Sequence, residues 1–180
     1  LREQLTNPSM EEFSFIENLF DVKSIIDWHL LLLISNAGDG FLKNFYLYKQ
    51  DDQHKIKVSP WDADHSFGRD GDGELNFTRF INLEKSLLFN KLLKSNEYRE
   101  ALKEQWAKHN SSDLLSIRGL TSRINILANK IEPRVYLNFE KWPIDGEGHY
   151  DDNDFRQEVQ LMLEFIVLRH PMIDKYIKEL

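Results

Sequence analysis

The stretch that decides the fold runs from Asn36 to Gly68 and reads N-A-G-D-G-F-L-K-N-F-Y-L-Y-K-Q-D-D-Q-H-K-I-K-V-S-P-W-D-A-D-H-S-F-G. It begins where a very apolar segment ends, crosses a loop that contains glycine, and continues through two strand-like segments to an acidic loop. Two groups of oxygen-bearing side chains lie in this stretch. The first is Asp39 with Asn44, and the second is Asp62 with Asp64, directly after the second strand-like segment.

A loop with the spacing D-x-x-x-x-N, then a hairpin, then an acidic loop is the order of parts in the catalytic half of a protein kinase. In kinases the first Asp contacts the substrate hydroxyl, the Asn holds a metal ion, and the second Asp holds the metal ions on ATP. The spacing by itself is weak support, because it also occurs in unrelated chains.

Each of these residues also has a plainer interpretation. Asp39, between two glycines, is typical of a turn, and Asn44 of the start of a strand. Asp62 and Asp64 suit an Asx-turn, although two close carboxylates repel each other unless a cation or a proton lies between them. Asn36 suits the left-handed residue that ends a helix.

The runs N-A-G-D, N-F-Y-L-Y and S-P-W-D-A-D-H-S-F-G resemble the spore coat protein H family, the CotH kinases. The resemblance extends over most of the chain, through Ser86–His109 and the segment Phe165–Leu180 that contains Arg169. It implies an atypical Ser/Thr protein kinase that uses ATP with Mg²⁺ or Mn²⁺ and acts on a protein hydroxyl.

The resemblance implies a role for each residue of the site. Asp39 would be the catalytic residue, Asn44, Asp62 and Asp64 would hold metal, and Asn36 would support the loop from behind. The chain departs from ordinary kinases in three places: Ala37 and Gly38 stand where His and Arg precede the Asp, and Phe41 replaces the Lys that follows it.

Periodicity predicts a mainly α-helical fold with one small β-hairpin, similar to the C-terminal lobe of an atypical kinase. The sequence predicts a helix from the Ser9–Glu12 capping box to Phe20 and a second helix that starts at Asp21. Further helices are expected over Leu83–Lys94 and over Glu97–His109, and a long one from Asp113 with a kink or break at Pro133. The last two are expected from Asp152 or Asn153 to His170 and from Pro171 onward. Strands are expected over Phe45–Lys49 and Lys55–Ser59.

Composition indicates one ordinary globular domain over residues 1–180, with 41% hydrophobic and 29% charged residues. The net charge of −7 argues against a nucleic-acid partner, and the absence of cysteine excludes thiol chemistry. The longest apolar run, Leu30–Ile34, is too short to span a membrane. The compartment stays open between bacterial cytoplasm, spore coat and secretion.

Two other metal sites are disfavoured. Asp70–Glu74 has the spacing of part of a calcium loop, but Gly68 and Arg79 occupy two positions that an EF-hand needs for Asp and Glu. The histidines lack the spacing of a zinc site.

Upstream of Asp39 there is no glycine-rich phosphate loop and no evident phosphate-binding Lys, so we expect the N-terminal lobe to lie outside this chain. Two alternatives to a kinase remain. One is a non-catalytic scaffold in a spore coat or extracellular assembly, and the other is a metal-dependent phosphoesterase that uses the same carboxylates.

Overall fold

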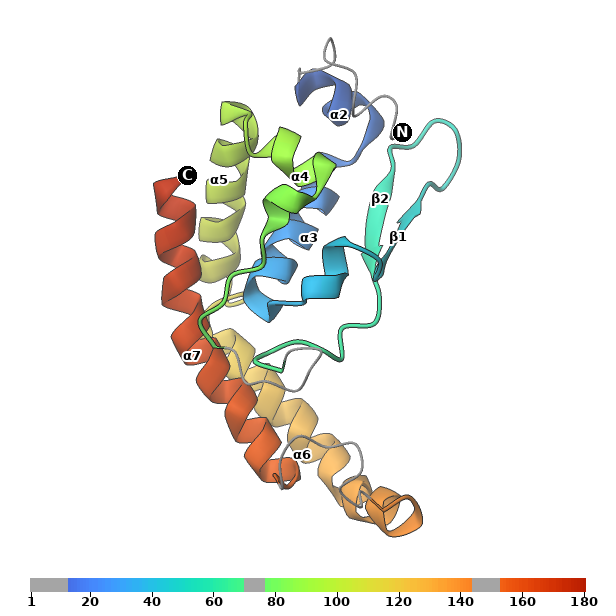
Figure 1. The fold of residues 1–180 in the computed structure, drawn as a ribbon, viewed down its shortest axis with the longest axis vertical. Helices are drawn as coiled ribbons and strands as arrows, with labels where there is room; N and C mark the ends of the chain where they lie inside the picture. Colours follow the sequence, from blue (N-terminus) through green and yellow to red (C-terminus); the bar gives the residue numbers. More distant parts are fainter. Residues whose placement is uncertain (1–12, 70–76, 144–152) are drawn as a thin grey trace.

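The computed structural model describes residues 13–69, 77–143 and 153–180 (Figure 1). Its elements are α2 (Phe13–Leu19), α3 (Val22–Ser35), the 3-10 turn η2 (Gly38–Phe41), β1 (Phe45–Tyr48), β2 (Lys57–Pro60), the 3-10 turn η3 (Leu83–Lys85), α4 (Leu87–Leu92), α5 (Asn96–Ser111), α6 (Ile117–Lys141) and α7 (Phe155–Glu179). The fold is therefore mainly α-helical with one antiparallel hairpin, as the sequence predicts.

Helix α3 is the centre of the molecule. It begins at Asp21, whose side chain accepts a hydrogen bond from the Ser24 N–H, as a helix N-cap does. The hairpin lies along one side of α3, with α5 and α7 along the other (Figure 1). Because α3 is covered on several sides, nine of its residues are buried, and its apolar side chains are not confined to one stripe.

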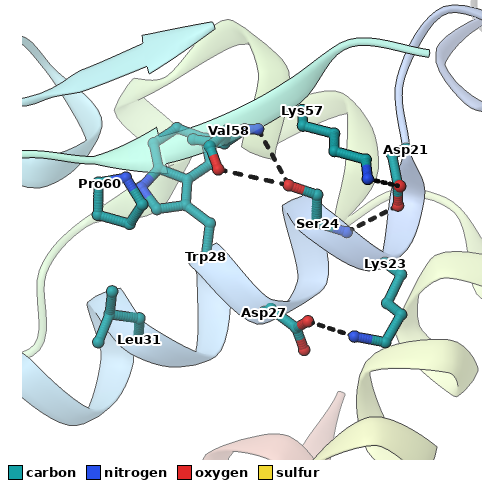
Figure 2. Close-up of a pocket in the computed structure, with 9 residues that line it drawn as sticks. All are labelled: Asp21, Lys23, Ser24, Asp27, Trp28, Leu31, Lys57, Val58 and Pro60. Atoms are coloured by element: carbon teal, nitrogen blue, oxygen red, sulfur yellow. Dashed lines mark hydrogen bonds and ion pairs between the residues drawn. The ribbon is translucent and has the colours of Figure 1, made fainter. Parts of the chain in front are cut away.

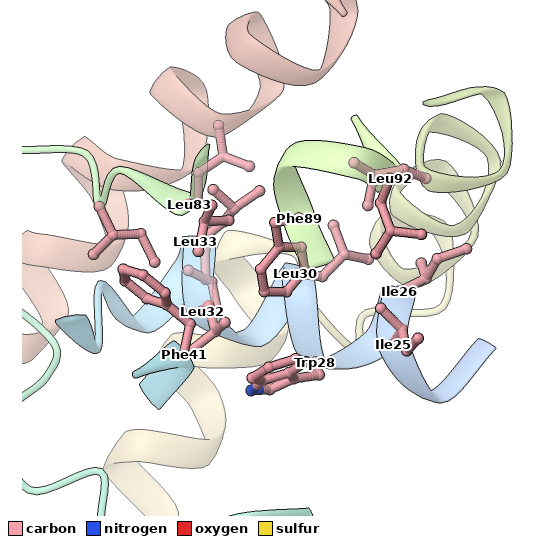
Figure 3. Close-up of a cluster of buried hydrophobic side chains, with 14 of the residues drawn as sticks. Ile25, Ile26, Trp28, Leu30, Leu32, Leu33, Phe41, Leu83, Phe89 and Leu92 are labelled. Carbon is pink, nitrogen blue, oxygen red and sulfur yellow. The ribbon is translucent and has the colours of Figure 1, made fainter. Parts of the chain in front are cut away.

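The core forms where α3 meets the segments that cross it. Figure 3 shows Trp28, Leu30 and Leu33 of α3 gathered with Phe89 and with side chains of η2, η3 and α4. The Trp28 ring lies 5.0 Å from that of Phe89, measured between ring centroids. Helix α3 thus provides a rigid base for the loop that follows it.

The hairpin is attached to α3 by its inner strand. The Ser24 hydroxyl accepts a hydrogen bond from the Val58 N–H at 3.0 Å and donates one to the Val58 carbonyl at 3.5 Å (Figure 2). Val58 is the buried residue of β2, and Phe45 pairs with Pro60 at the end of the hairpin nearest η2. This attachment sets the position of the residues that leave β2.

Several predicted helix boundaries are wrong. Helix α6 begins at Ile117 with Ser116 as its cap, because Asp113 is in the left-handed region (φ 57°). A Cβ on Gly119 would lie 1.7 Å from the Asp113 carbonyl oxygen, so the preceding loop folds tightly onto the helix. The predicted helix over 83–94 is a 3-10 turn followed by the short α4. The proposed Ser9–Glu12 box lies outside the described residues.

Helix α7 is also longer than predicted. Its cap is Asp154, in a capping box with Gln157, and it continues through Pro171 to Glu179. Pro133 likewise lies within the continuous α6. A proline removes the donor to the carbonyl four residues earlier. Those earlier residues, Asn129 and Val167, are both exposed, so water can replace the missing donor.

The Nε2 atom of His29 is the one buried side-chain polar atom without a hydrogen-bond partner among the described residues. His29 is fully buried, and its Nδ1 lies 2.9 Å from the Tyr98 hydroxyl. Burial lowers the pKa of His29 from 6.5 to about 3, since nothing near the ring stabilises an imidazolium. The folded chain therefore carries a neutral His29.

We expect this residue to make stability depend on pH. On acidification the unfolded chain binds the proton first, so the stabilisation is complete above pH 6.5 and is lost between pH 6.5 and about 3. Between pH 7 and pH 5 the wild type should lose about 2 kcal/mol more than His29→Gln. Urea denaturation at both pH values measures this. His54→Gln, at an exposed turn, is the control and should follow the wild type; equal losses in all three would contradict the prediction.

Candidate functional site

Asn36 ends α3 and joins it to the far end of the chain. It is left-handed (φ 56°), and its N–H donates to the Leu32 carbonyl at 2.9 Å, as in a helix C-cap. Its side-chain oxygen accepts a hydrogen bond from Arg169 of α7 at 3.0 Å. Asn36 therefore caps the helix, as one interpretation of the sequence had it, and its side chain joins the end of α3 to α7.

Arg169, which the sequence analysis named only as part of the family resemblance, is the main support of the end of α3. Its fully buried guanidinium also donates to the Leu33 carbonyl and to the Arg79 carbonyl, each at 2.8 Å, and lies 4.0 Å from the centre of the Phe80 ring. Burial lowers its pKa to about 10, which still leaves it charged at neutral pH. The sequence signal for this role was that Arg169 stands at helical spacing among the apolar residues Phe165, Ile166 and Ile173.

The turn η2 holds Asp39 at the edge of the core. The Trp28 indole donates to the Gly40 carbonyl at 3.2 Å, and a Cβ on Gly40 would lie 2.5 Å from a Leu32 methyl carbon, so any side chain at this position would force the buried Leu32 side chain to move. The Asp39 carbonyl accepts from the N–H groups of Leu42, Lys43 and Asn44 at 3.0–3.1 Å. The backbone of Asp39 is thus fixed, while its side chain is about half exposed.

The hairpin brings Asn44 and Asp62 together. The Asn44 side-chain amide donates to the Asp62 carbonyl at 2.9 Å, and the Trp61 N–H donates to the Asn44 carbonyl at 3.0 Å. This follows from the antiparallel register, since Asn44 directly precedes β1 and Asp62 lies two residues after Pro60 at the end of β2. Asp62 is left-handed (φ 53°), a conformation that Asp and Asn adopt more readily than other non-glycine residues.

Lys43 is a residue that the sequence analysis missed. Its ammonium lies 2.9 Å from the Asp39 carboxylate. The hydrogen bond and charge of Asp39 raise the pKa of Lys43, and the Asp62 charge raises it further. Lys43 is therefore paired with Asp39 and lies in the electric field of Asp62. The four-residue spacing between Asp39 and Lys43, common in ion pairs on helices, was the available signal.

The acidic loop after Asp62 is anchored beyond Asp64. Ser66 donates to the Ala63 carbonyl, and the left-handed Phe67 donates its N–H to the Ser35 carbonyl at 2.7 Å. Gly68 has φ 98°, and a Cβ there would lie 3.2 Å from the Phe165 ring. The exposed Asp64 has His65 as its neighbour, at 3.6 Å, and no described contact joins it to Asn44 or to the Asp62 side chain.

The oxygens at the hairpin end that could hold a small hard cation are the Asp62 carboxylate and the Asn44 amide oxygen. Asn44 uses its amide nitrogen on the Asp62 backbone, so its side-chain oxygen has no described hydrogen bond. Mg²⁺ at nucleotide sites is held by one or two carboxylates, water and phosphate rather than by a cage of protein ligands. Within residues 13–69, 77–143 and 153–180, no three acidic or histidine side chains form such a cage. Asp62 with Asn44 is the donor set that remains.

A pocket of about 420 Å³ lies on the other side of the hairpin, between β2 and α3 (Figure 2). Its charged side chains are already paired, Lys23 with Asp27 at 2.6 Å and Lys57 with Asp21 at 3.7 Å. Its floor is Trp28 and Val58. We interpret the pocket as part of the attachment between hairpin and helix.

We expect Arg169→Met to destabilise the chain by about 3 kcal/mol or more, because it leaves two buried carbonyls and the Asn36 amide oxygen without donors. The control is Arg156→Met, which removes an ion pair with Glu132 near the surface and should cost less than about 1 kcal/mol. Chemical denaturation compares the two. A loss from Arg169→Met no larger than the control's would contradict the supporting role.

Two comparisons with known proteins bear on this arrangement. The family model described as "CotH kinase protein" matches residues 1–173. Inner spore coat protein H of Bacillus subtilis (strain 168) is 25% identical over 175 residues, which are 97% of this chain and 45% of that relative. The chain therefore spans less than half the length of this relative. The match covers nearly every described element, and the chain belongs to the CotH family.

Proposed function

We propose that this chain is the catalytic-loop and metal-binding half of an atypical protein kinase, which transfers the γ-phosphoryl group of ATP to a Ser or Thr hydroxyl of a protein. The observation that carries the proposal is the meeting of Asp39, Lys43, Asn44 and Asp62 at one end of the hairpin. Family membership supports it. The site lies on well-packed elements, as a site that must hold its geometry requires.

In this proposal Asp39 orients the acceptor hydroxyl and takes its proton. One of its carboxylate oxygens is bound by Lys43, and the other has no described partner and is available to the hydroxyl. The fixed backbone of η2 limits how far the carboxylate can move. Positioning of this kind supplies a large part of the rate in phosphoryl transfer.

Asp62 and Asn44 would hold Mg²⁺ or Mn²⁺ through the carboxylate and the amide oxygen, and Asp64 would contribute through bound water or by orienting Asp62. The metal ion would supply positive charge against the phosphate oxygens of ATP. The hydrogen bond from Asn44 to the Asp62 carbonyl keeps the two ligands together before any ion binds.

The rival proposal is a non-catalytic scaffold. It is favoured by the exposure of Asp62 and Asp64 and by the name of the curated relative, an inner spore coat protein. Nucleotide binding by the full-length protein separates the two, because a scaffold has no need of metal-dependent ATP binding. Transfer to water instead of to protein would favour the phosphoesterase alternative.

Asp62→Asn in the full-length protein should lower phosphoryl transfer at least about 100-fold and leave stability within about 0.5 kcal/mol of wild type. The carboxylate makes no described hydrogen bond, and Asn tolerates the left-handed backbone at this position. Transfer from labelled ATP to a Ser-rich acceptor with Mn²⁺ measures the effect. The control is Asp51→Asn in the hairpin turn. Activity of Asp62→Asn within a few-fold of wild type would contradict the assignment.

We also expect the 180-residue chain alone to fold but to transfer no phosphate. An ATP-binding cleft needs a second half, and the resemblance assigns no phosphate-binding loop to these residues. The chain alone should bind Mn²⁺ only in about the millimolar range, as expected of a few exposed oxygen ligands. Metal-dependent transfer by the chain alone that disappears in Asp39→Ala would contradict this boundary.

A further inference from the structure

Lys43 binds Asp39 at both ends. Its backbone N–H donates to the Asp39 carbonyl at 3.0 Å, and its ammonium lies 2.9 Å from the Asp39 carboxylate. The two side chains are 68% and 45% exposed. An ion pair this exposed adds little to folding stability, so the fold does not explain it.

The charges around Lys43 suggest what the pair does. The carboxylates of Asp39, Asp62 and Asp64 belong to the two loops that meet at the hairpin end, where Lys43 pairs with Asp39 and directly precedes Asn44, whose side chain donates to the Asp62 carbonyl. Close carboxylates repel unless a cation lies between them. Lys43 supplies such a cation from within the chain.

We propose that Lys43 is a positioning residue of this site: its ammonium holds the Asp39 carboxylate in place and offsets the negative charge of the Asp39 and Asp62 carboxylates, so that it competes with the metal ion for that charge. This inference rests on the proposed function. It assigns to Lys43, four residues after the catalytic Asp, part of the work that ordinary kinases give to the Lys two residues after it, where this chain has Phe41.

The inference predicts opposite changes in two measurements. Removing the ammonium removes a repulsion between like charges, so Lys43→Met should bind Mn²⁺ about three- to tenfold more tightly in the absence of nucleotide. The same change frees the Asp39 side chain, so kcat for transfer should fall at least about tenfold while KM for ATP stays within about threefold. A residue that served only the fold would not tighten metal binding.

The experiment uses the full-length protein. Mn²⁺ binding is measured by electron paramagnetic resonance, and transfer is measured with labelled ATP. Lys43→Arg keeps the charge and should match the wild type in Mn²⁺ affinity and recover most of kcat. The control for loss of a hairpin cation is Lys49→Met, whose partner is Asp52 in the hairpin turn. It should change neither measurement.

The outcomes separate this inference from the proposed function. Unchanged or weaker Mn²⁺ binding by Lys43→Met, in a wild type that binds Mn²⁺ and transfers phosphate, overturns the role of Lys43 alone. A wild type that neither binds Mn²⁺ nor transfers phosphate overturns the proposed function, and the inference with it. Tighter binding by Lys43→Met with lower kcat, both restored by Lys43→Arg, supports the inference.

Discussion

The structure depends on one buried cation. The Arg169 guanidinium joins the end of α3, the segment at Arg79 and helix α7 through three hydrogen bonds, and it packs on the Phe80 ring. A buried charge is tolerated only when nearly all its donors are satisfied, so these partners must be in place together. Because Asn36 is one of them, the point where the functional loop leaves α3 is held by the same interaction.

The candidate site is built outward from that point in short steps. The Trp28 indole holds η2 through Gly40, the Ser24 hydroxyl holds β2 through Val58, and Phe67 returns the acidic loop to Ser35. Each contact is made by α3 or by the residue at its end. The loop can therefore expose carboxylates to solvent while its backbone stays fixed, and site chemistry needs both properties.

The charged groups of the candidate site differ in burial from the cation that supports the fold. The ion pair of Lys43 with Asp39 is exposed, whereas Arg169, the cation that supports the fold, is fully buried. Among the described residues, none of the helices has the length and apolar character needed to cross a bilayer.

The sequence by itself determined the helices, the hairpin and the order of the polar residues, because periodicity and turn chemistry act over a few residues. The D-x-x-x-x-N spacing, together with the family resemblance carried by P-W-D-A-D-H-S-F-G, is what led from the sequence to Asp39, Asn44 and Asp62 as candidate site residues. Boundaries at Asp113 and Pro171 were mispredicted, since local packing and solvent access decided them. Only the tertiary structure decided that Asn36 binds Arg169, 133 residues away, and that the Asn44 side chain reaches the Asp62 carbonyl, 18 residues away. Such contacts depend on where distant segments meet in space, which spacing along the chain does not encode.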